Sequence, residues 1–288
     1  MANLKEIRNR IASVSSTKQI TSAMKMVSAA KLRKSQSAIV QLRPYSSQME
    51  AMVYRLADDQ AEEVPYIKTK KDENKILLIA LTSNKGLCSV FNSSIIKLTK
   101  KKIDEYKNKG KEVYLQSFGK KGDAIFKQIE KIHYLGSEDE MWEQLSFEKI
   151  ASFTSKILKQ YEKGDYDKVE IIYNRFKNAA VQEPIVESFL PFDLTQNKEL
   201  KTNNNYIFEP NRAEIFQSII PLFLNTKMYR CFLDSFTSEH GARMSSMNKA
   251  TDNAQSLLND LTLTYNKLRQ AGITNEIIEI CSGANALS

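Results

Sequence analysis

One stretch near the C-terminal end of the 288-residue chain decides the fold, and it reads LDSFTSEHGARMSSMNKATDNAQSLLNDLTLTYNKL over residues 233–268. Mostly apolar or small residues recur there at intervals of three and four, at positions 233, 236, 240, 244, 247, 251, 254, 258, 261, 265 and 268. A mean spacing of about 3.5 residues indicates a helix that supercoils around a partner helix. Only Gly241 interrupts the segment between Pro221 and Gly272, so we expect one helix of roughly 75 Å, too long to pack entirely within a domain.

The N-terminal segment is the natural partner, because no glycine or proline occurs before Pro44 and residues 1–58 therefore predict one long helix. Its apolar residues form a narrow seam rather than a broad face, with a first stripe at Leu4, Ile7, Ile11 and Val14 and a second at Ile20, Met24 and Val27. We expect the two chain ends to pair as an antiparallel coiled coil. Two separate surface helices of one globule are the alternative.

Local signals mark the ends and the weak points of these helices. Asn211 with Glu214 three residues later predicts a capping box at the start of the C-terminal helix. Pro44 and Pro221 are expected to kink the helices or, for Pro221, to break the first turns.

The middle of the chain alternates strand-like and helix-like segments. Short apolar runs predict strands at 76–81, 112–118, 132–135, 168–176 and 184–189, and helices are expected at 92–109, 123–130 and 147–163. Such alternation predicts a mostly parallel sheet with an antiparallel edge. The expected fold class is therefore α/β: a long antiparallel coiled coil plus a central Rossmann-like α/β domain, with segments 1–58, 74–195 and 211–288 as the three parts.

Composition excludes several classes of site. The longest apolar run has six residues, far fewer than the ~20 that a membrane-spanning helix needs. Three scattered cysteines and two histidines argue against a zinc site and indicate a reducing compartment. The paired carboxylates Glu276 and Glu279 lie in no evident cleft, so ion pairing with a partner is expected of them rather than acid–base catalysis.

The loop after the first expected strand, residues 82–89, has one glycine and lacks both the GxGxxG and the GxxxxGK[ST] pattern. We therefore expect a plain strand-to-helix turn with no cofactor. Cys88 in this loop is expected to be a buried packing residue rather than a nucleophile. His240 is expected to be a packed polar position of the coiled coil rather than a ligand.

The net charge of +8 resides in the first 43 residues. They contain one acidic residue, Glu6, and nine basic residues: Lys5, Arg8, Arg10, Lys18, Lys25, Lys31, Arg33, Lys34 and Arg43. Four roles fit such a segment: nucleic-acid binding, membrane binding, a transit peptide, or insertion into an acidic cavity of a partner. No aromatic residue is present for base stacking, and no Trp/Phe/Leu-rich face for a membrane. Composition alone leaves these four open.

The motifs at the two ends resemble the gamma subunit of F-type ATP synthase. At the start these are LKEIRNRI (4–11), TKQIT (17–21), AMKMV (23–27) and KLRK (31–34). Near the end they are SEH (238–240), ARM (242–244), ATDNA (250–254), YNKLRQ (265–270) and the terminal pattern from Ile273 to Ala286. Weaker matches are Tyr173-Asn174-x-Phe176 and Gln182-x-Pro184. The resemblance covers essentially the whole chain.

The resemblance implies a non-catalytic shaft. Its coiled coil would turn inside a hexamer of alternating alpha and beta subunits and couple proton flow to the beta-subunit sites. The epsilon subunit and the membrane c-ring would meet its α/β domain. The expected location is peripheral, on the cytoplasmic face of a bacterial inner membrane, with membrane association only through the complex, no nucleic acid and no presequence.

The resemblance also assigns contacts between rotor and stator to Met24, Lys25, Arg269, Gln270 and Thr274. Three positions depart from the family pattern: Asn84 replaces Asp, Ser89 replaces Gly, and Gly241 replaces Ala. The first two put any inherited role of the 82–89 loop in doubt. A mid-helix glycine costs about 1 kcal/mol relative to alanine, so the helix is expected to be softer at Gly241.

Overall fold

The computed structural model describes residues 4–57, 66–67, 73–143, 145–192, 209 and 211–287. Two long helices, α1 (Leu4–Leu56) and α6 (Arg212–Leu287), begin and end the described chain. Between them lie β1 (Lys75–Leu81), α2 (Phe91–Asn108), β2 (Glu112–Phe118), α3 (Lys120–Phe126), β3 (His133–Ser137), α4 (Glu140–Glu143), α5 (Phe147–Glu162), β4 (Lys168–Phe176) and β5 (Gln182–Leu190).

The five strands form one sheet in the order β3-β2-β1-β4-β5. All neighbouring pairs are parallel except β4 with β5, which is antiparallel, so the predicted mixed sheet is confirmed. Strand β1 is the central strand of this sheet. Six of its seven residues are buried, because both faces of the sheet are covered there. The last residues 193–195 of the predicted middle segment lie outside the described residues.

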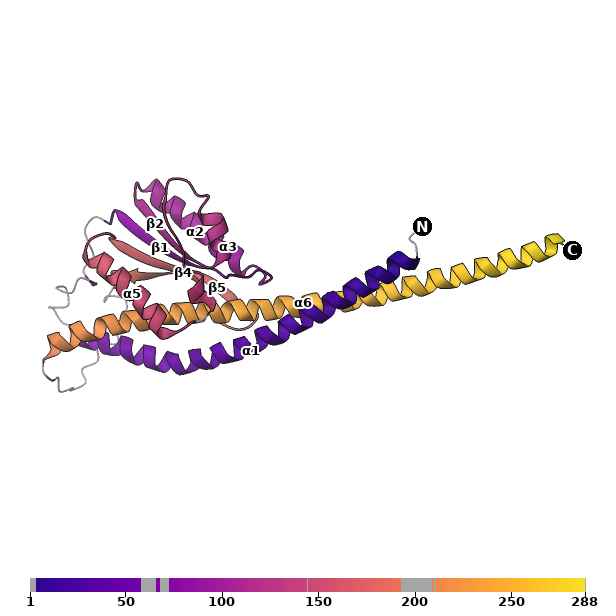
Figure 1. Cartoon of the computed structure of the whole chain (residues 1–288). Coiled ribbons are helices and arrows are strands. Elements are labelled where there is room, and N and C mark those ends of the chain that lie inside the picture. The colour runs from indigo at the N-terminus through magenta and orange to yellow at the C-terminus, as the bar shows by residue number, and fades with distance from the viewer. Residues whose placement is uncertain are drawn as a thin grey trace. The chain divides into compact units, whose positions relative to one another are not determined.

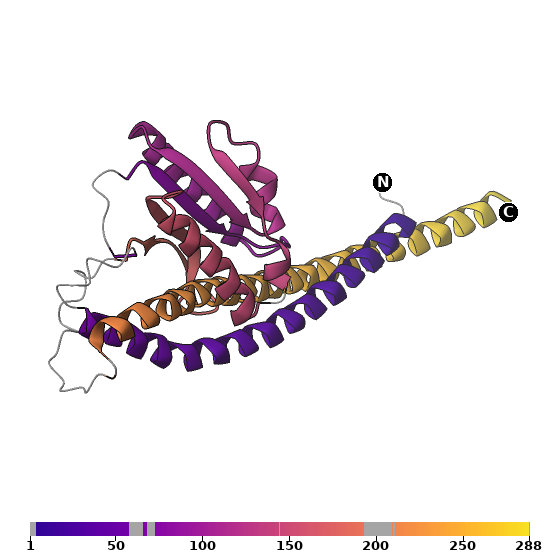
Figure 2. The same ribbon diagram turned by 60° about the vertical axis from the view of Figure 1, so that its left-hand side comes forward.

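Helices cover both faces of this sheet (Figure 1). Ile76, Leu78 and Ala80 of β1 pack in the core beneath α2 and α3. Leu77, Ile79 and Leu81 point the other way, into a larger core that includes α5 and the first half of α6. The turned view in Figure 2 shows the same layering, with the sheet between α2 and α5. Alternate side chains of one strand thus serve two cores, as the pleat requires.

Two helices differ from the prediction. The helix expected at 123–130 lies earlier in the chain, as α3 from Lys120 to Phe126, and follows Gly119 with a φ of 91°. Gly122 inside α3 packs closely on the loop after β1, because an added Cβ would come within 2.6 Å of Thr82 Oγ1. Helix α4 was not predicted, since four residues are too few to show a helical period.

The predicted cap of α6 is confirmed, whereas one expectation about the prolines is not. Asn211 Oδ1 accepts a hydrogen bond from the Glu214 backbone N–H at 2.9 Å, which is the capping interaction predicted for α6. Pro44 and Pro221 lie inside α1 and α6 without ending them, so the expected break at Pro221 is wrong. Ile220 and Leu224 on either side of Pro221 are buried, and their packing holds the helix despite the missing backbone donor.

Two compact units divide the chain: residues 1–28 with 244–288, and residues 29–243. We call them the paired-helix unit and the globular unit. The division into segments 1–58, 74–195 and 211–288 stays a prediction.

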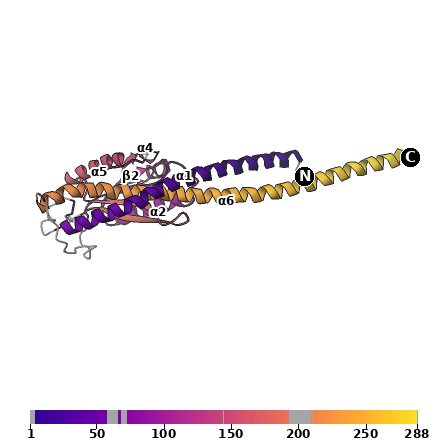
Figure 3. The same cartoon turned by 90° about the horizontal axis from the view of Figure 1, so that it is seen from below.

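In the paired-helix unit, α1 and α6 run antiparallel, as predicted (Figure 3). Lys25 Nζ donates to Asn248 Oδ1 at 2.7 Å, and Arg8 Nη2 donates to the Tyr265 hydroxyl at 3.1 Å. The partner in α6 therefore advances by 17 residues while α1 retreats by 17, which is the register of two straight antiparallel helices.

On α6 the less exposed positions of this unit are those of the predicted stripe, 244, 247, 251, 254, 258, 261, 265 and 268, together with a few neighbours near its start and Gly272 after its end. The first three stripe positions, 233, 236 and 240, fall instead in the globular unit. On α1 the first stripe holds at Ile7, Ile11 and Val14, whereas the second holds only at Met24, which is partly buried. Ile20 and Val27 are 60% and 59% exposed, whereas Thr21 and Ser28 are buried. Small polar residues occupy these buried positions of α1, because two closely packed helices leave little room for larger side chains between them.

Candidate functional site: a crevice closed by α6 and the outer face of the helix pair

In doubly wound sheets, ligands bind beyond the carboxyl ends of the strands, where the strand order reverses. Here the order reverses between β1 and β4, and the loop after β1 (residues 82–90) lies at that edge. This is the place where a nucleotide site would be expected.

The polar groups of the loop after β1 are hydrogen-bonded within the loop and to the start of α2. The Ser83 backbone N–H donates to Asn92 Oδ1 at 2.9 Å, and the Ser83 hydroxyl donates to the Lys85 carbonyl at 2.7 Å. Leu87 and Ser89 have φ angles of 61° and 53°, the left-handed region that glycine tolerates best. The departure at Ser89 therefore puts a side chain into a conformation suited to the family's glycine.

Asn84, the other departure in this loop, connects the loop to the segments that follow β2 and β3. Its Nδ2 donates to the Asp139 carbonyl at 3.0 Å, and its Oδ1 accepts from the Lys120 backbone N–H at 3.2 Å. An aspartate accepts but does not donate when ionised, so only the amide makes both bonds.

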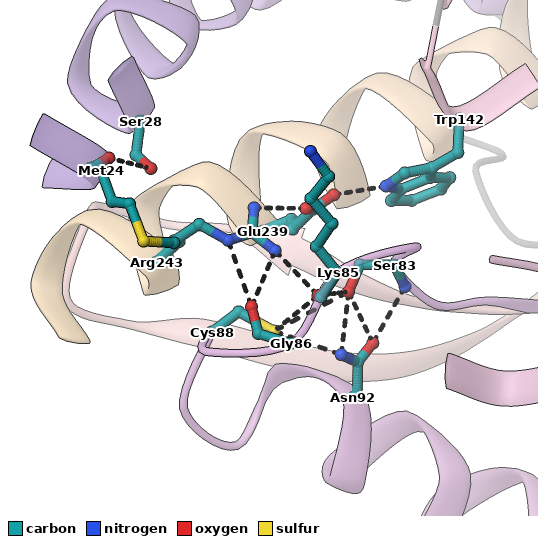
Figure 4. Close-up of polar contacts among 10 residues, drawn as sticks. All are labelled: Met24, Ser28, Ser83, Lys85, Gly86, Cys88, Asn92, Trp142, Glu239 and Arg243. Carbon is teal, nitrogen blue, oxygen red and sulfur yellow. Dashed lines mark hydrogen bonds and ion pairs between the residues drawn. The ribbon is translucent and has the colours of Figure 1, made fainter. Parts of the chain in front are cut away.

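Helix α6 fills the crevice at this edge of the sheet, and a buried ion pair holds the helix there (Figure 4). Arg243 donates to Glu239, and its Nη2 also donates to the Lys85 carbonyl at 2.9 Å. The Trp142 indole N–H donates to the second carboxylate oxygen of Glu239. Because Arg243 and Glu239 are both buried and hydrogen-bonded, they fix α6 to the loop after β1 and to α4.

Two further contacts bring α6 against the end of β4. The Ser238 hydroxyl donates to the Asn174 carbonyl at 2.9 Å. A Cβ added to Gly241 would lie 3.3 Å from Ala179 Cα, just beyond the end of β4. Gly241 thus allows close packing, which explains a glycine that the sequence alone suggested only as a soft point. The chain's own helix occupies the edge where a cofactor would bind.

Cys88 and His240 behave as packed residues, as predicted for the former. Cys88 is buried, and burial raises the pKa of its thiol, so it carries little thiolate. His240 packs edge-on against Phe236 in the globular unit rather than in the coiled-coil seam. Burial, with lesser effects from Arg243 and Lys31, lowers the pKa of His240 to about 3. The imidazole is therefore neutral at physiological pH.

The five predicted contact residues all lie in the paired-helix unit. Met24 is half-buried, and Lys25 is tied to Asn248. Arg269, Gln270 and Thr274 are exposed and lie at or just beyond the end of the pairing, since Arg8 already contacts Tyr265. The structure thus separates them into two groups along the helices, and their role stays a prediction.

The polar bonds that join α1 and α6 were not predicted. Besides those of Arg8 and Lys25, Lys18 Nζ donates to Gln255 Oε1, and the Thr251 hydroxyl donates to the Thr21 hydroxyl at 2.9 Å. Continuing the 7, 11, 14 spacing through 18, 21, 25 and 28 would have found these positions. Ile20 and Val27 were predicted in their place because they are apolar, whereas the buried positions Thr21 and Ser28 are polar.

The outer face of the helix pair carries exposed apolar side chains. Ile20, Met26 and Val27 on α1 are well exposed, and so is Leu263 on α6. Beyond Gly272, α6 continues with Ile273, Ile277, Ile278 and Ile280 all exposed. Four exposed isoleucines within eight residues of one helix are typical of a surface that contacts another molecule.

The described residues also bear on membrane and metal sites. None of the helices there is long and apolar enough to cross a bilayer. No group of three or more His, Cys, Asp and Glu residues in the described ranges is arranged to hold a metal ion.

Comparison with known proteins places this geometry in context. A family model described as ATP synthase matches residues 3–287. The ATP synthase gamma chain of Flavobacterium johnsoniae is 49% identical over 289 residues, with all of both chains covered. A chain of the central stalk and c-ring structure of the Tetrahymena thermophila mitochondrial ATP synthase is 25% identical, with a TM-score of 0.57 over 80% of this chain and 99% of that chain. A chain of the Euglena gracilis mitochondrial ATP synthase, at 19% identity, shares the fold, with a TM-score of 0.68 over 99% of this chain and 94% of that chain.

Proposed function

We propose a mechanical role for this chain, which belongs to the gamma subunits of the F-type ATP synthases: it turns inside a ring of catalytic subunits and couples ion flow to their nucleotide chemistry. Membership makes it a non-catalytic subunit of the central stalk in the F1 sector. The rotation, the coupling to proton flow and the individual contacts are our proposal.

The observation that carries the proposal is the exposed surface of the paired-helix unit. Its seam is sheltered, yet Ile20, Val27 and Leu263 remain exposed on the outside. An apolar outer face on a helix pair suits a sleeve that surrounds it. The helix beyond Gly272, where no residue described in α1 reaches, suits a bearing that closes around a single helix.

Asymmetry converts such a shaft into a control element. A bound molecule shifts a conformational equilibrium only by its different affinity for the two states. The helix pair presents side chains of α1 on one side and different side chains of α6 on the other. Three identical catalytic subunits would therefore meet three different surfaces at any moment and adopt different conformations.

The partners follow from this arrangement. We assign a hexamer of alternating alpha and beta subunits to the paired-helix unit, and the epsilon subunit and the c-ring to the globular unit. The related solved structures are of a central stalk with its c-ring and of an F1 sector with its c-ring, which supports this assignment. The location would be peripheral, on the cytoplasmic face of a bacterial inner membrane.

We further assign the contacts with the ring to Met24 and Lys25 on α1 and to Arg269, Gln270 and Thr274 on α6. Arg269 is exposed, and its planar guanidinium can donate two parallel hydrogen bonds to one carboxylate. We expect Arg269→Ala to weaken coupling and leave the free energy of unfolding within about 0.5 kcal/mol of the wild type, because the side chain is exposed. The check is ATP synthesis in reconstituted vesicles beside urea unfolding, and unchanged synthesis with full retention of the chain in the complex would refute the assignment.

The decisive experiment for the function compares ATP hydrolysis by the cognate alpha and beta subunits with and without this chain, after gel filtration. Co-elution with raised and sustained turnover supports the shaft. Elution of the chain by itself with unchanged turnover would contradict it. Salt-sensitive retention on duplex DNA would then favour a nucleic-acid-binding coiled coil instead.

A further inference from the structure

A cavity of about 380 Å³ lies in the globular unit, where α1 and α6 pass the edge strand β5. Helix α1 lines it with Ser46, Glu50 and Tyr54, which recur every four residues and therefore share one helix face. Helix α6 contributes Lys227 and Arg230, which are three residues apart and also share a face. The cavity has no residue in common with the bonds that close the crevice after β1, so it is a separate feature of the unit.

The wall that α1 provides carries polar groups without partners. Ser46 is only 4% exposed, and neither its hydroxyl nor the Glu50 carboxylate has a hydrogen bond within the described part of the chain. Ser28 and Ser35, the other buried serines of α1, donate to carbonyls of their own helix. The oxygens of Ser46 and Glu50 keep accessible surface at the cavity that they line. Because buried polar groups are nearly always hydrogen-bonded, these oxygens point to a molecule that occupies the cavity.

The wall that α6 provides is a set of donors with positive charge. Arg230 Nη2 donates to Glu187 Oε1 at 2.7 Å, and the guanidinium has five N–H groups, so several remain available. Lys227 Nζ donates to the Ser188 carbonyl at 2.8 Å and keeps further N–H groups. The Tyr173 hydroxyl donates to Glu187 Oε2 at 2.6 Å, so both oxygens of that carboxylate already accept bonds. A ligand at this wall would therefore bind the cations rather than Glu187.

The two charged walls share the cavity without touching. Among the described residues, no ion pair joins Glu50 to Arg230 or Lys227, although all three line the same space. With Glu187, the lining holds two carboxylates and two cations, so its formal charge is zero and a single ion of either sign is not favoured. A molecule that carries both charges satisfies both walls, with its anionic group toward α6 and its cationic group toward α1.

We propose that this cavity binds a free α-amino acid with an apolar side chain. Its carboxylate accepts two parallel hydrogen bonds from the planar guanidinium of Arg230. Its ammonium group donates to the Glu50 carboxylate and to the Ser46 hydroxyl. The buried rings of Phe192 and Phe223, which also line the cavity, provide the apolar surface for the side chain. The volume is near the lower end of the roughly 300–1,000 Å³ of small-molecule sites, which suits one amino acid.

Calorimetric titration of the full-length chain tests the ligand class. L-Alanine, L-leucine and L-phenylalanine are the probes at pH 7.0, and at least one should bind saturably with one site per chain. For leucine, 3-methylbutylamine lacks the carboxylate and 4-methylpentanoate lacks the ammonium group. Each analogue of a bound amino acid should bind at least about tenfold more weakly than its parent, because it leaves one charged wall unpaired.

Three results would overturn the proposal. The first is the absence of saturable binding for all three amino acids. The second is equal binding of a parent amino acid and of an analogue that lacks one charge. The third is tighter binding of O-phosphoethanolamine than of every amino acid, which would assign the cavity to a phosphate zwitterion such as a lipid headgroup.

Variants of the α1 wall locate the site and leave the pair of Arg230 with Glu187 intact. Glu50→Gln should weaken binding at least about tenfold, whereas Glu148→Gln, at an exposed position of α5, should leave it within about twofold. Ser46→Ala should weaken binding about three- to fivefold, the size of one hydrogen bond, and Ser47→Ala at the exposed neighbouring position is its matched control. Equal weakening by a site variant and its control would refute the site.

Discussion

One helix serves two units in opposite ways. Between residues 231 and 243, in the globular unit, every residue of α6 except Phe236 is buried. Between 255 and 271, in the paired-helix unit, no residue is fully buried, and only about every third or fourth position is even partly sheltered. The comparison shows that a continuous helix can act as a core element in one region and as an open surface in the next. Its neighbours decide which role it takes, because helical geometry is the same in both.

The largest expected effect tests the buried half of this comparison. Arg243→Ala removes one partner of a buried ion pair and leaves the Glu239 carboxylate buried without its counterion. We expect the free energy of unfolding to fall by about 3–5 kcal/mol, measured by urea denaturation. The double variant Arg243→Met/Glu239→Gln is the control and should lose much less, since no charge is then stranded.

A second pair of variants sharpens the comparison within the paired-helix unit. Met247 is 3% exposed in the seam, whereas Leu263 is 61% exposed on the outer face. Met247→Ala should cost about 2–4 kcal/mol of unfolding free energy through the cavity it leaves. Leu263→Ala should change it by less than about 0.5 kcal/mol. Equal losses in thermal or urea unfolding would show that the outer face is covered within the chain itself.

A third prediction concerns a charge on the buried half of α6. Burial raises the pKa of the Asp234 carboxyl to about 6, against the opposing effect of Arg230, so folding disfavours the ionised form. The folded chain then binds the proton more tightly than the unfolded chain, and this group destabilises the fold increasingly as pH rises from about 4 to about 6. Above that window the penalty is complete, on the order of 2–3 kcal/mol.

Asp234→Asn should therefore raise the free energy of unfolding at pH 8 and leave it nearly unchanged at pH 4. Urea denaturation of both proteins at the two pH values is the measurement. A gain of the same size at both would mean that the carboxyl does not titrate in this range.

The smallest effect concerns the loop after β1. Ser89 has a φ of 53°, a conformation that costs a non-glycine residue roughly 1 kcal/mol. Ser89→Gly should stabilise the globular unit by about that amount or less, since glycine also gains entropy in the unfolded chain. Ser93→Gly inside α2 is the contrasting control and should destabilise it. Stabilisation by both variants would contradict the strain at Ser89.

Part of the candidate site could be predicted from the sequence, and part could not. The spacing 244, 247, 251, 254, 258 identified the seam of α6, because helical period and burial are locally linked. The α1 face was missed past Val14, since Thr21 and Ser28 are small polar residues whose burial depends on the partner helix. No spacing rule joins Arg243 to the Lys85 carbonyl, which lies 158 residues earlier.

The sequence by itself determined the two long helices, the mixed sheet and the family, because each depends on patterns within a few turns or on motifs preserved as strings. Only the tertiary structure decided that α6 fills the crevice of the sheet, that Gly241 permits close approach to Ala179, and that Glu50 and Arg230 line one cavity. These features depend on which surfaces meet across more than a hundred residues. Close packing of side chains, rather than local propensity, fixes such contacts.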